Sequence, residues 1–137
     1  PNGKKTNELF SKACELGEET ACYNLGLSYA MGDGVQKDAA KAAQIFAASC
    51  ERGHVGSCAD LGVCYFKGEG VEKDYERAVL LFTNACSGAS ALACANLGFA
   101  YEKGMGVEKN KNAAKELYDR GCKLGEFNAC QYLKNLR

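Results

Sequence analysis

Cysteine is the residue type with the most distinctive pattern in this chain of 137 residues, which contains nine of them. Eight form pairs with a spacing of eight, and the pairs recur every 36 residues: Cys14 and Cys22, Cys50 and Cys58, Cys86 and Cys94, Cys122 and Cys130. Such a density usually indicates disulfides or metal ligands. Structural zinc sites use cysteine pairs about two to four residues apart, or histidines, that converge in space. Here the pairs are wider and His54 is the single histidine, so the spacing favours disulfides over a metal site.

The ninth cysteine, Cys64, has no partner at this spacing. It is either a free reactive thiol or a small buried side chain. Ser28 and Ala100 occupy the equivalent positions one period away, and both are small. We therefore favour a packing role for Cys64.

The serines and the histidine give little support for catalysis. An acyl-transfer enzyme needs a nucleophile, a base within hydrogen-bond reach and a pocket for the oxyanion. None of the serines begins the S-x-x-K signature of β-lactamases, and the G-x-G-V segments lack the G-K-[ST] ending of a phosphate-binding loop. His54 lies in a short predicted turn, where we expect a solvated side chain rather than a general base. A pair of catalytic carboxylates stays open, although the sequence proposes no particular pair.

The residues around the cysteines repeat with the same period, which predicts a helical solenoid because a fixed period of about 20–50 residues is typical of stacked supersecondary units. Each unit is expected to contain two helices, at 20–31 and 39–51 in the first complete unit, separated by a Gly-x-Gly loop. Asp38 should cap the second helix. Leucine, glycine and tyrosine recur on the first helix: Leu25, Gly26 and Tyr29; Leu61, Gly62 and Tyr65; Leu97, Gly98 and Tyr101.

The expected fold class is all-α: an α/α solenoid of four 36-residue helix pairs, each with one disulfide, forming a single domain over residues 1–137. Mid-helix glycine costs about 1 kcal/mol relative to alanine, so its repetition implies that helices pack closely there. Cys14 should end one helix and Cys22 should begin the next. Antiparallel helices joined by a short turn bring such positions within the roughly 4.4–6.8 Å between Cα atoms that a disulfide needs.

Charge and hydropathy exclude several classes of partner. Lysine plus arginine equals aspartate plus glutamate at 17 each, so the charge balance does not point to nucleic acid or an anionic membrane. No apolar run approaches the roughly 18 residues of a membrane span. The chain starts at Pro1 without a methionine or a signal-peptide pattern, so we expect a mature or trimmed chain whose export signal is not visible.

The segment L-G-x-x-Y-x-x-G-x-G-V-x-K-D-x-x-x-A, present at 25–42 and 61–78, resembles the Sel-one-like repeat, a relative of the tetratricopeptide repeat. With the added cysteine pairs, essentially the whole chain is similar to the Helicobacter cysteine-rich protein family. The resemblance implies a right-handed superhelix and a secreted or periplasmic location. It also implies either a protein-interaction adaptor or a penicillin-binding protein with weak β-lactamase activity. It supplies no catalytic residues to transfer.

The first helix of each unit has a second face, opposite the buried stripe, that we expect to line a concave groove. Asn24, Asp60 and Asn96 recur at one position on this face. An amide both donates and accepts hydrogen bonds, so it can pair with a peptide group whatever the side chains of the bound segment. In tetratricopeptide relatives, the asparagine at this position contacts the backbone of an extended peptide.

Leu27, Val63 and Phe99 form an apolar stripe beside these polar positions. An outward apolar stripe often marks an interaction surface. Alternatively, the stripe packs against the neighbouring repeat, and Asn24 or Asn96 bonds only local backbone. The two interpretations stay open at this stage. The other candidate groove residues are Tyr23, Lys67 and Lys103.

The sequence therefore predicts a secreted or periplasmic, disulfide-stapled scaffold, expected to be monomeric, that binds a peptide or protein segment in its concave groove. The alternative is weak β-lactam hydrolysis, with a β-lactam or peptidoglycan-like small molecule as ligand. We expect no cofactor, no nucleic acid and no membrane as partner.

Overall fold

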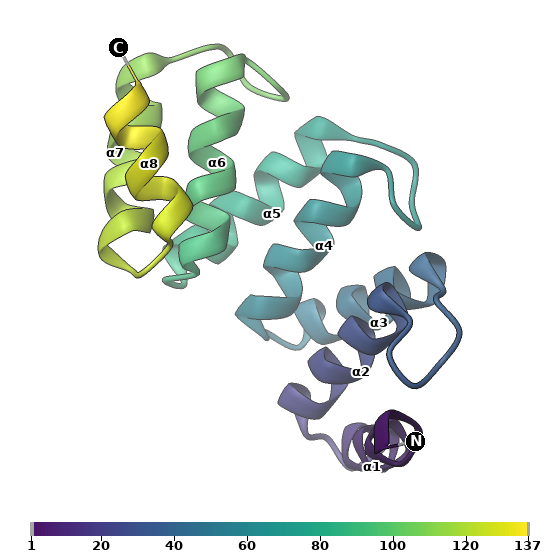
Figure 1. Cartoon of the computed structure of the whole chain (residues 1–137). Helices are drawn as coiled ribbons and strands as arrows, with labels where there is room; N and C mark the ends of the chain where they lie inside the picture. Colours follow the sequence, from purple (N-terminus) through teal and green to yellow (C-terminus); the bar gives the residue numbers. More distant parts are fainter. Residues whose placement is uncertain (1, 137) are drawn as a thin grey trace.

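Eight α-helices follow one another in the computed structural model, which describes residues 2–136 except for the side chain of Asn2. No strand occurs among these residues, so the all-α prediction is confirmed; Pro1 and Arg137 lie outside the described part. The helices form an elongated stack with α1 at one end and α7 and α8 at the other (Figure 1). Their bounds are α1 Asn2–Glu15, α2 Glu19–Met31, α3 Ala39–Glu51, α4 Val55–Lys67, α5 Tyr75–Ser87, α6 Ala91–Lys103, α7 Lys111–Lys123 and α8 Phe127–Asn135.

The repeated sequence signals set the helix ends as predicted. In the three complete units, the first helix (α2, α4 or α6) ends at a glycine in the left-handed conformation, with φ 75° at Gly32 after α2. After the loop, the Asp38 carboxylate accepts a hydrogen bond of 3.0 Å from the backbone N–H of Lys41 and so caps α3. Asp74 and Asn110 cap α5 and α7 in the same way. The helix α3 has its predicted bounds, and α2 begins one residue earlier than expected.

The mid-helix glycines make room for an aromatic ring from the second helix of the unit. A Cβ atom added to Gly62 would lie 2.6 Å from the Phe82 ring, and one added to Gly98 would lie 2.7 Å from the Tyr118 ring. Both rings are buried, with 1% and 0% of their surface exposed. The close approach predicted from the sequence is therefore confirmed as a ring packed directly on a helix backbone.

A loop glycine connects one unit to the unit before it. Gly70 has φ 76°, and an added Cβ would collide with the backbone carbonyl of Ala39 at the start of α3. Gly106 lies in the same way on the carbonyl of Tyr75 at the start of α5. Each loop therefore packs on the first turn of the preceding unit's second helix, where no side chain fits between them.

All four predicted disulfides are present. They join Cys14–Cys22, Cys50–Cys58, Cys86–Cys94 and Cys122–Cys130, with Cα atoms 4.6–4.7 Å apart. Each bridge crosses the turn between the second helix of one unit and the first helix of the next. The bridges therefore constrain turns locally and do not connect distant units.

The core consists of three clusters in succession along the stack. Alanine supplies most of the buried residues, and the largest buried side chains are Phe46, Phe82 and Tyr118. One cluster lies between α3 and α4, the next between α4, α5 and α6, and the last between α6, α7 and α8. Stability therefore depends on contacts between neighbouring helices, as in other repeat proteins.

The ring-on-glycine contact predicts a specific coupling. Gly62→Ala should destabilise the protein by about 1–3 kcal/mol, because the new methyl group overpacks the Phe82 ring. Phe82→Leu in the same chain should recover part of this loss by removing the ring. Urea unfolding of the two single variants and the double variant measures the coupling. Additive effects, or a Gly62→Ala variant as stable as the wild type, would show that the ring does not occupy this space.

Candidate functional site

The apolar stripe predicted on the groove face contributes mainly to packing. Leu27 is half-buried against the cluster that contains Phe46 and Leu61, and Val63 is half-buried against the next cluster. Phe99 packs against the last cluster, and its ring centroid lies 6.2 Å from that of Phe66. Of the two interpretations, the structure therefore supports packing between repeats, and the expected outward stripe is not continuous.

One depression remains on the groove face near the N-terminal end of the stack, with a volume of about 300 Å³. It brings together Asn24 and Leu27, two of the predicted groove residues, with side chains that sequence reasoning did not single out. Met31, a residue that is 73% exposed, contributes its flexible side chain. The remaining lining residues are Phe10, Ser28 and Asp33.

The three aligned polar positions differ in their surroundings. The side-chain amides of Asn24 and Asn96 are half-buried and make no hydrogen bond within residues 2–136, so both can pair with a ligand. Asp60 instead interacts with the Tyr23 hydroxyl of the preceding unit. Its Oδ2 atom is buried and has no hydrogen-bond donor in the described structure. Asp60 therefore faces protein, whereas the amides of the two asparagines are open to a ligand.

Burial controls the ionisation of Tyr23 and Asp60. It raises the pKa of the Asp60 carboxyl, and the hydrogen bond from Tyr23 opposes this shift. Burial, together with the Asp60 carboxylate, also raises the pKa of the Tyr23 hydroxyl, so the tyrosine stays neutral. The pair connects α2 to α4 and removes Tyr23 from the set of open groove residues.

The two predicted groove lysines are exposed at the ends of α4 and α6. Lys67 lies at the last residue of α4. Lys103 lies over the Phe99 ring, with Nζ 5.9 Å from the centroid, and 3.5 Å from the Glu102 carboxylate. Neither lysine lines the depression that contains Asn24.

A serine–histidine cluster that the sequence did not predict lies where α3, α4 and their turn meet. Ser57 Oγ donates a hydrogen bond of 2.9 Å to Ser49 Oγ. His54 Nδ1 accepts from the backbone N–H of Ser57 at 3.1 Å and lies 3.0 Å from Ser57 Oγ. The positions equivalent to Ser49 and Ser57 in the other units hold only alanine or glycine. This difference between units is the sequence signal that could have identified the cluster.

This cluster has a structural role. The distance between His54 and Ser57 would suit a base and its nucleophile, but both serines are 0% exposed. A substrate carbonyl therefore has no path to the Ser57 hydroxyl. His54 is half-buried and caps the N-terminus of α4. The prediction that its side chain is solvated is therefore wrong.

An ion pair ties the start of α2 to the turn after α3. The Arg52 guanidinium donates a hydrogen bond to the Glu19 carboxylate, and its Nη2 atom lies 3.7 Å from Cys22 Sγ. The hydrogen bond from Arg52 lowers the pKa of Glu19, against a smaller opposite effect of burial. The pair therefore joins the start of α2 to the end of α3 within one helix pair and stabilises it when Glu19 is ionised.

Cys64 is free and half-buried, and it packs beside the cluster formed by α3 and α4. Burial, followed by the nearby Asp60 and Glu69 charges, raises the pKa of the Cys64 thiol to about 11. Since the thiolate is the reactive form, Cys64 has little nucleophilic character at neutral pH. These properties support the packing role.

Residues 2–136 contain neither a cluster of metal-ligating side chains nor a helix that could span a membrane. No three histidine, cysteine, aspartate or glutamate side chains come close enough to hold a metal ion. None of the helices described is long and apolar enough to span a bilayer.

The Glu19–Arg52 pair predicts a pH-dependent stability. The pKa of Glu19 is lowered by folding, so its contribution is present above the pKa of an ordinary glutamate and is lost as the pH falls. Glu19→Gln should therefore lower the urea midpoint at pH 7 and have a much smaller effect near pH 3. Glu116→Gln, at an exposed site on α7, serves as the control. An equal loss for Glu19→Gln at both pH values would contradict the role of the charge.

Comparisons with solved structures place this arrangement among known repeat proteins. A protective antigen of uropathogenic Escherichia coli with an SLR fold is 29% identical (TM-score 0.86), and a Sel1 repeat protein from Oxalobacter formigenes is 30% identical (TM-score 0.88). These matches cover 94% and 96% of this chain, which spans only 28% and 54% of those chains. Helicobacter pylori cysteine rich protein B is 32% identical (TM-score 0.74), with 96% of this chain and 95% of that one covered.

No curated protein is similar enough in sequence to count as a match. The Sel1 repeat family profile matches the chain at residues 1–18, 20–54, 55–90 and 91–126, which is most of its length. The last three segments each cover a helix pair with its loop (α2 with α3, α4 with α5, α6 with α7), and the first segment covers α1. The chain therefore belongs to the Sel1 repeat family.

Proposed function

We propose that this protein is a binding scaffold that holds an extended peptide or protein segment along the face formed by α2, α4 and α6. The observation that carries the proposal is the depression in which the open amide of Asn24 lies beside the apolar side chains of Leu27 and Met31. The amide can pair with a peptide group, and the apolar side chains can receive one side chain of the segment. Met31 is suited to adapt to different side chains, because its thioether is flexible and polarisable.

The disulfides support a location for this activity. Structural disulfides persist in oxidising compartments, so we propose a secreted or periplasmic scaffold that acts as a monomeric single domain. Helicobacter pylori cysteine rich protein B is a relative of similar length with the same repeat fold. The disulfides then keep the binding face in shape without a large apolar core.

Nothing observed favours β-lactam hydrolysis, the other activity that the sequence resemblance implies. The serine–histidine pair found in the described part of the chain is Ser57 with His54, and Ser57 is 0% exposed. An acyl-enzyme mechanism needs a nucleophile that the substrate can reach. The binding face offers open amides and apolar side chains instead.

The binding proposal is tested with peptides selected from a random phage-displayed library against the wild-type protein. Asn24→Ala together with Asn96→Ala should weaken binding of the selected peptides about tenfold, because two hydrogen bonds to the peptide backbone are lost. Isothermal titration with synthetic peptides measures the change in affinity.

The matched control is Asn84→Ala with Asn112→Ala, which removes two exposed asparagines from the second helices of their units. This control should bind as the wild type does. If the Asn24/Asn96 variant keeps full affinity, or both double variants lose affinity equally, the segment does not lie along this face.

A further inference from the structure

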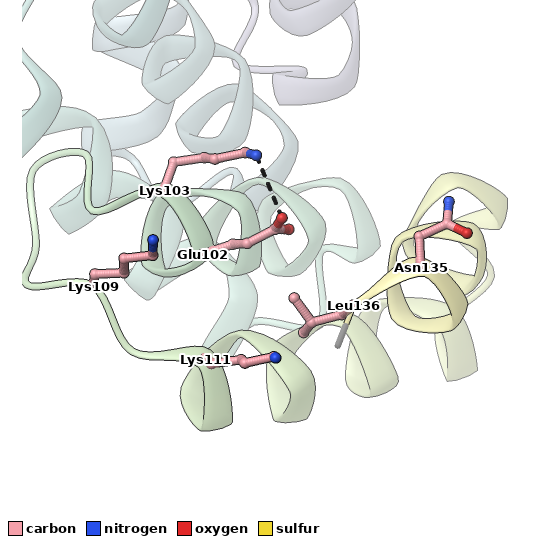
Figure 2. A pocket seen from close by; sticks show the side chains of 6 residues that line it. All are labelled: Glu102, Lys103, Lys109, Lys111, Asn135 and Leu136. Atoms are coloured by element: carbon pink, nitrogen blue, oxygen red, sulfur yellow. Dashed lines mark ion pairs between the residues drawn. The ribbon is translucent and has the colours of Figure 1, made fainter.

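A second pocket lies at the C-terminal end of the stack and differs in charge from the depression near Asn24. Its volume is about 280 Å³, and three separate segments contribute to it: the end of α6, the start of α7 with its preceding loop, and the end of α8 (Figure 2). Its lining residues are Glu102, Lys103, Lys109, Lys111, Asn135 and Leu136. Three of these six side chains are lysines, in a chain whose formal net charge is zero.

The single carboxylate of the pocket already has partners. Glu102 accepts a hydrogen bond of 2.6 Å from the Tyr118 hydroxyl and pairs with Lys103 at 3.5 Å (Figure 2). Lys109 and Lys111 form no ion pair within residues 2–136. The pocket therefore carries positive charge that the described protein groups do not neutralise.

The preceding unit shows that this arrangement is not a property of the repeat. There, Phe66 and Tyr75 occupy the positions of Glu102 and Lys111, and their ring centroids lie 5.0 Å apart. Lys73, the equivalent of Lys109, lies over the Tyr75 ring at 5.5 Å from its centroid. Where one unit has an aromatic pair that engages the lysine, the last unit has an open pocket with unpaired lysines.

We propose that this pocket binds a phosphate group, either free or in a small monoester. Two unpaired ammonium groups match a dianion, and a lysine acts as a point charge that suits the oxygens of a tetrahedral phosphate. A carboxylate carries only one negative charge, so two unpaired lysines favour the doubly charged phosphate over it. Among residues 2–136, no arginine lines the pocket. Leu136 is half-buried, lines the pocket just after α8 (Figure 2) and offers an apolar contact to the organic part of an ester.

The proposal does not depend on peptide binding, because the pocket and the Asn24 depression share no residue. It is tested by NMR titration of the ¹⁵N-labelled protein with phenyl phosphate, inorganic phosphate and benzoate at constant ionic strength. We expect saturable shifts of the backbone amides that line the pocket with both phosphates, and weaker binding of benzoate. Tighter binding of phenyl phosphate than of inorganic phosphate identifies a monoester site, and equal affinity identifies a site for free phosphate.

Lys109→Gln with Lys111→Gln should weaken phosphate binding about tenfold, since two charge-assisted contacts are lost. Lys4→Gln with Lys12→Gln removes the same charge at exposed sites on α1, at the other end of the stack, and should leave the affinity unchanged. Equal binding of benzoate and phenyl phosphate would overturn the proposal. So would unchanged phosphate affinity in the Lys109/Lys111 variant, or an equal loss in both double variants.

Discussion

The disulfide across each turn between units is the constraint on which the rest of the structure depends. The buried core is mostly alanine with three large aromatic rings, so each unit buries little apolar surface of its own. A bridge that closes a loop of about nine residues contributes about 2.6 kcal/mol in the chain-entropy model. The contribution of four such bridges is a large part of the free energy of unfolding, about 5–15 kcal/mol, that is typical of folded domains. The fold can therefore be stable although the contacts between its helices are made mainly by small alanine side chains.

Two glycine contacts then fix how the stapled helices stack. Within a unit, the aromatic ring of the second helix lies on the mid-helix glycine of the first, as Phe82 does on Gly62. Between units, a loop glycine such as Gly70 lies against the backbone at the start of α3. Because both contacts involve backbone atoms, little adjustment is possible, and the face formed by α2, α4 and α6 keeps its shape. A fixed face requires less ordering when a flexible segment binds.

The repeat made the fold and the covalent links predictable. The spacing of eight identified every bridge, and Asp38 marked the start of α3, since both signals are local and occur in each unit. The site was less predictable because it depends on contacts between units. Leu27 seemed exposed from its position on the helix but packs on the neighbouring cluster, and Asp60 is engaged by Tyr23 of the unit before. Ser49 and Ser57 were visible only as departures from the repeat pattern.

The two ends of the stack also differ from each other in the side chains that line their pockets. The N-terminal depression keeps the open amide of Asn24 among apolar side chains, and the C-terminal pocket gathers lysines where the preceding unit has two aromatic rings. The scaffold between them is uniform because the staples and glycines recur. The C-terminal pocket therefore depends on positions that differ between units, whereas Asn24 and Asn96 occupy one repeated position on the first helices.

Mapping of the cysteines by mass spectrometry of a non-reducing digest tests the central claim most directly. The account predicts four linked peptide pairs, each joining cysteines eight residues apart, and one free thiol at Cys64. A bridge between different turns, or one that includes Cys64, would contradict it.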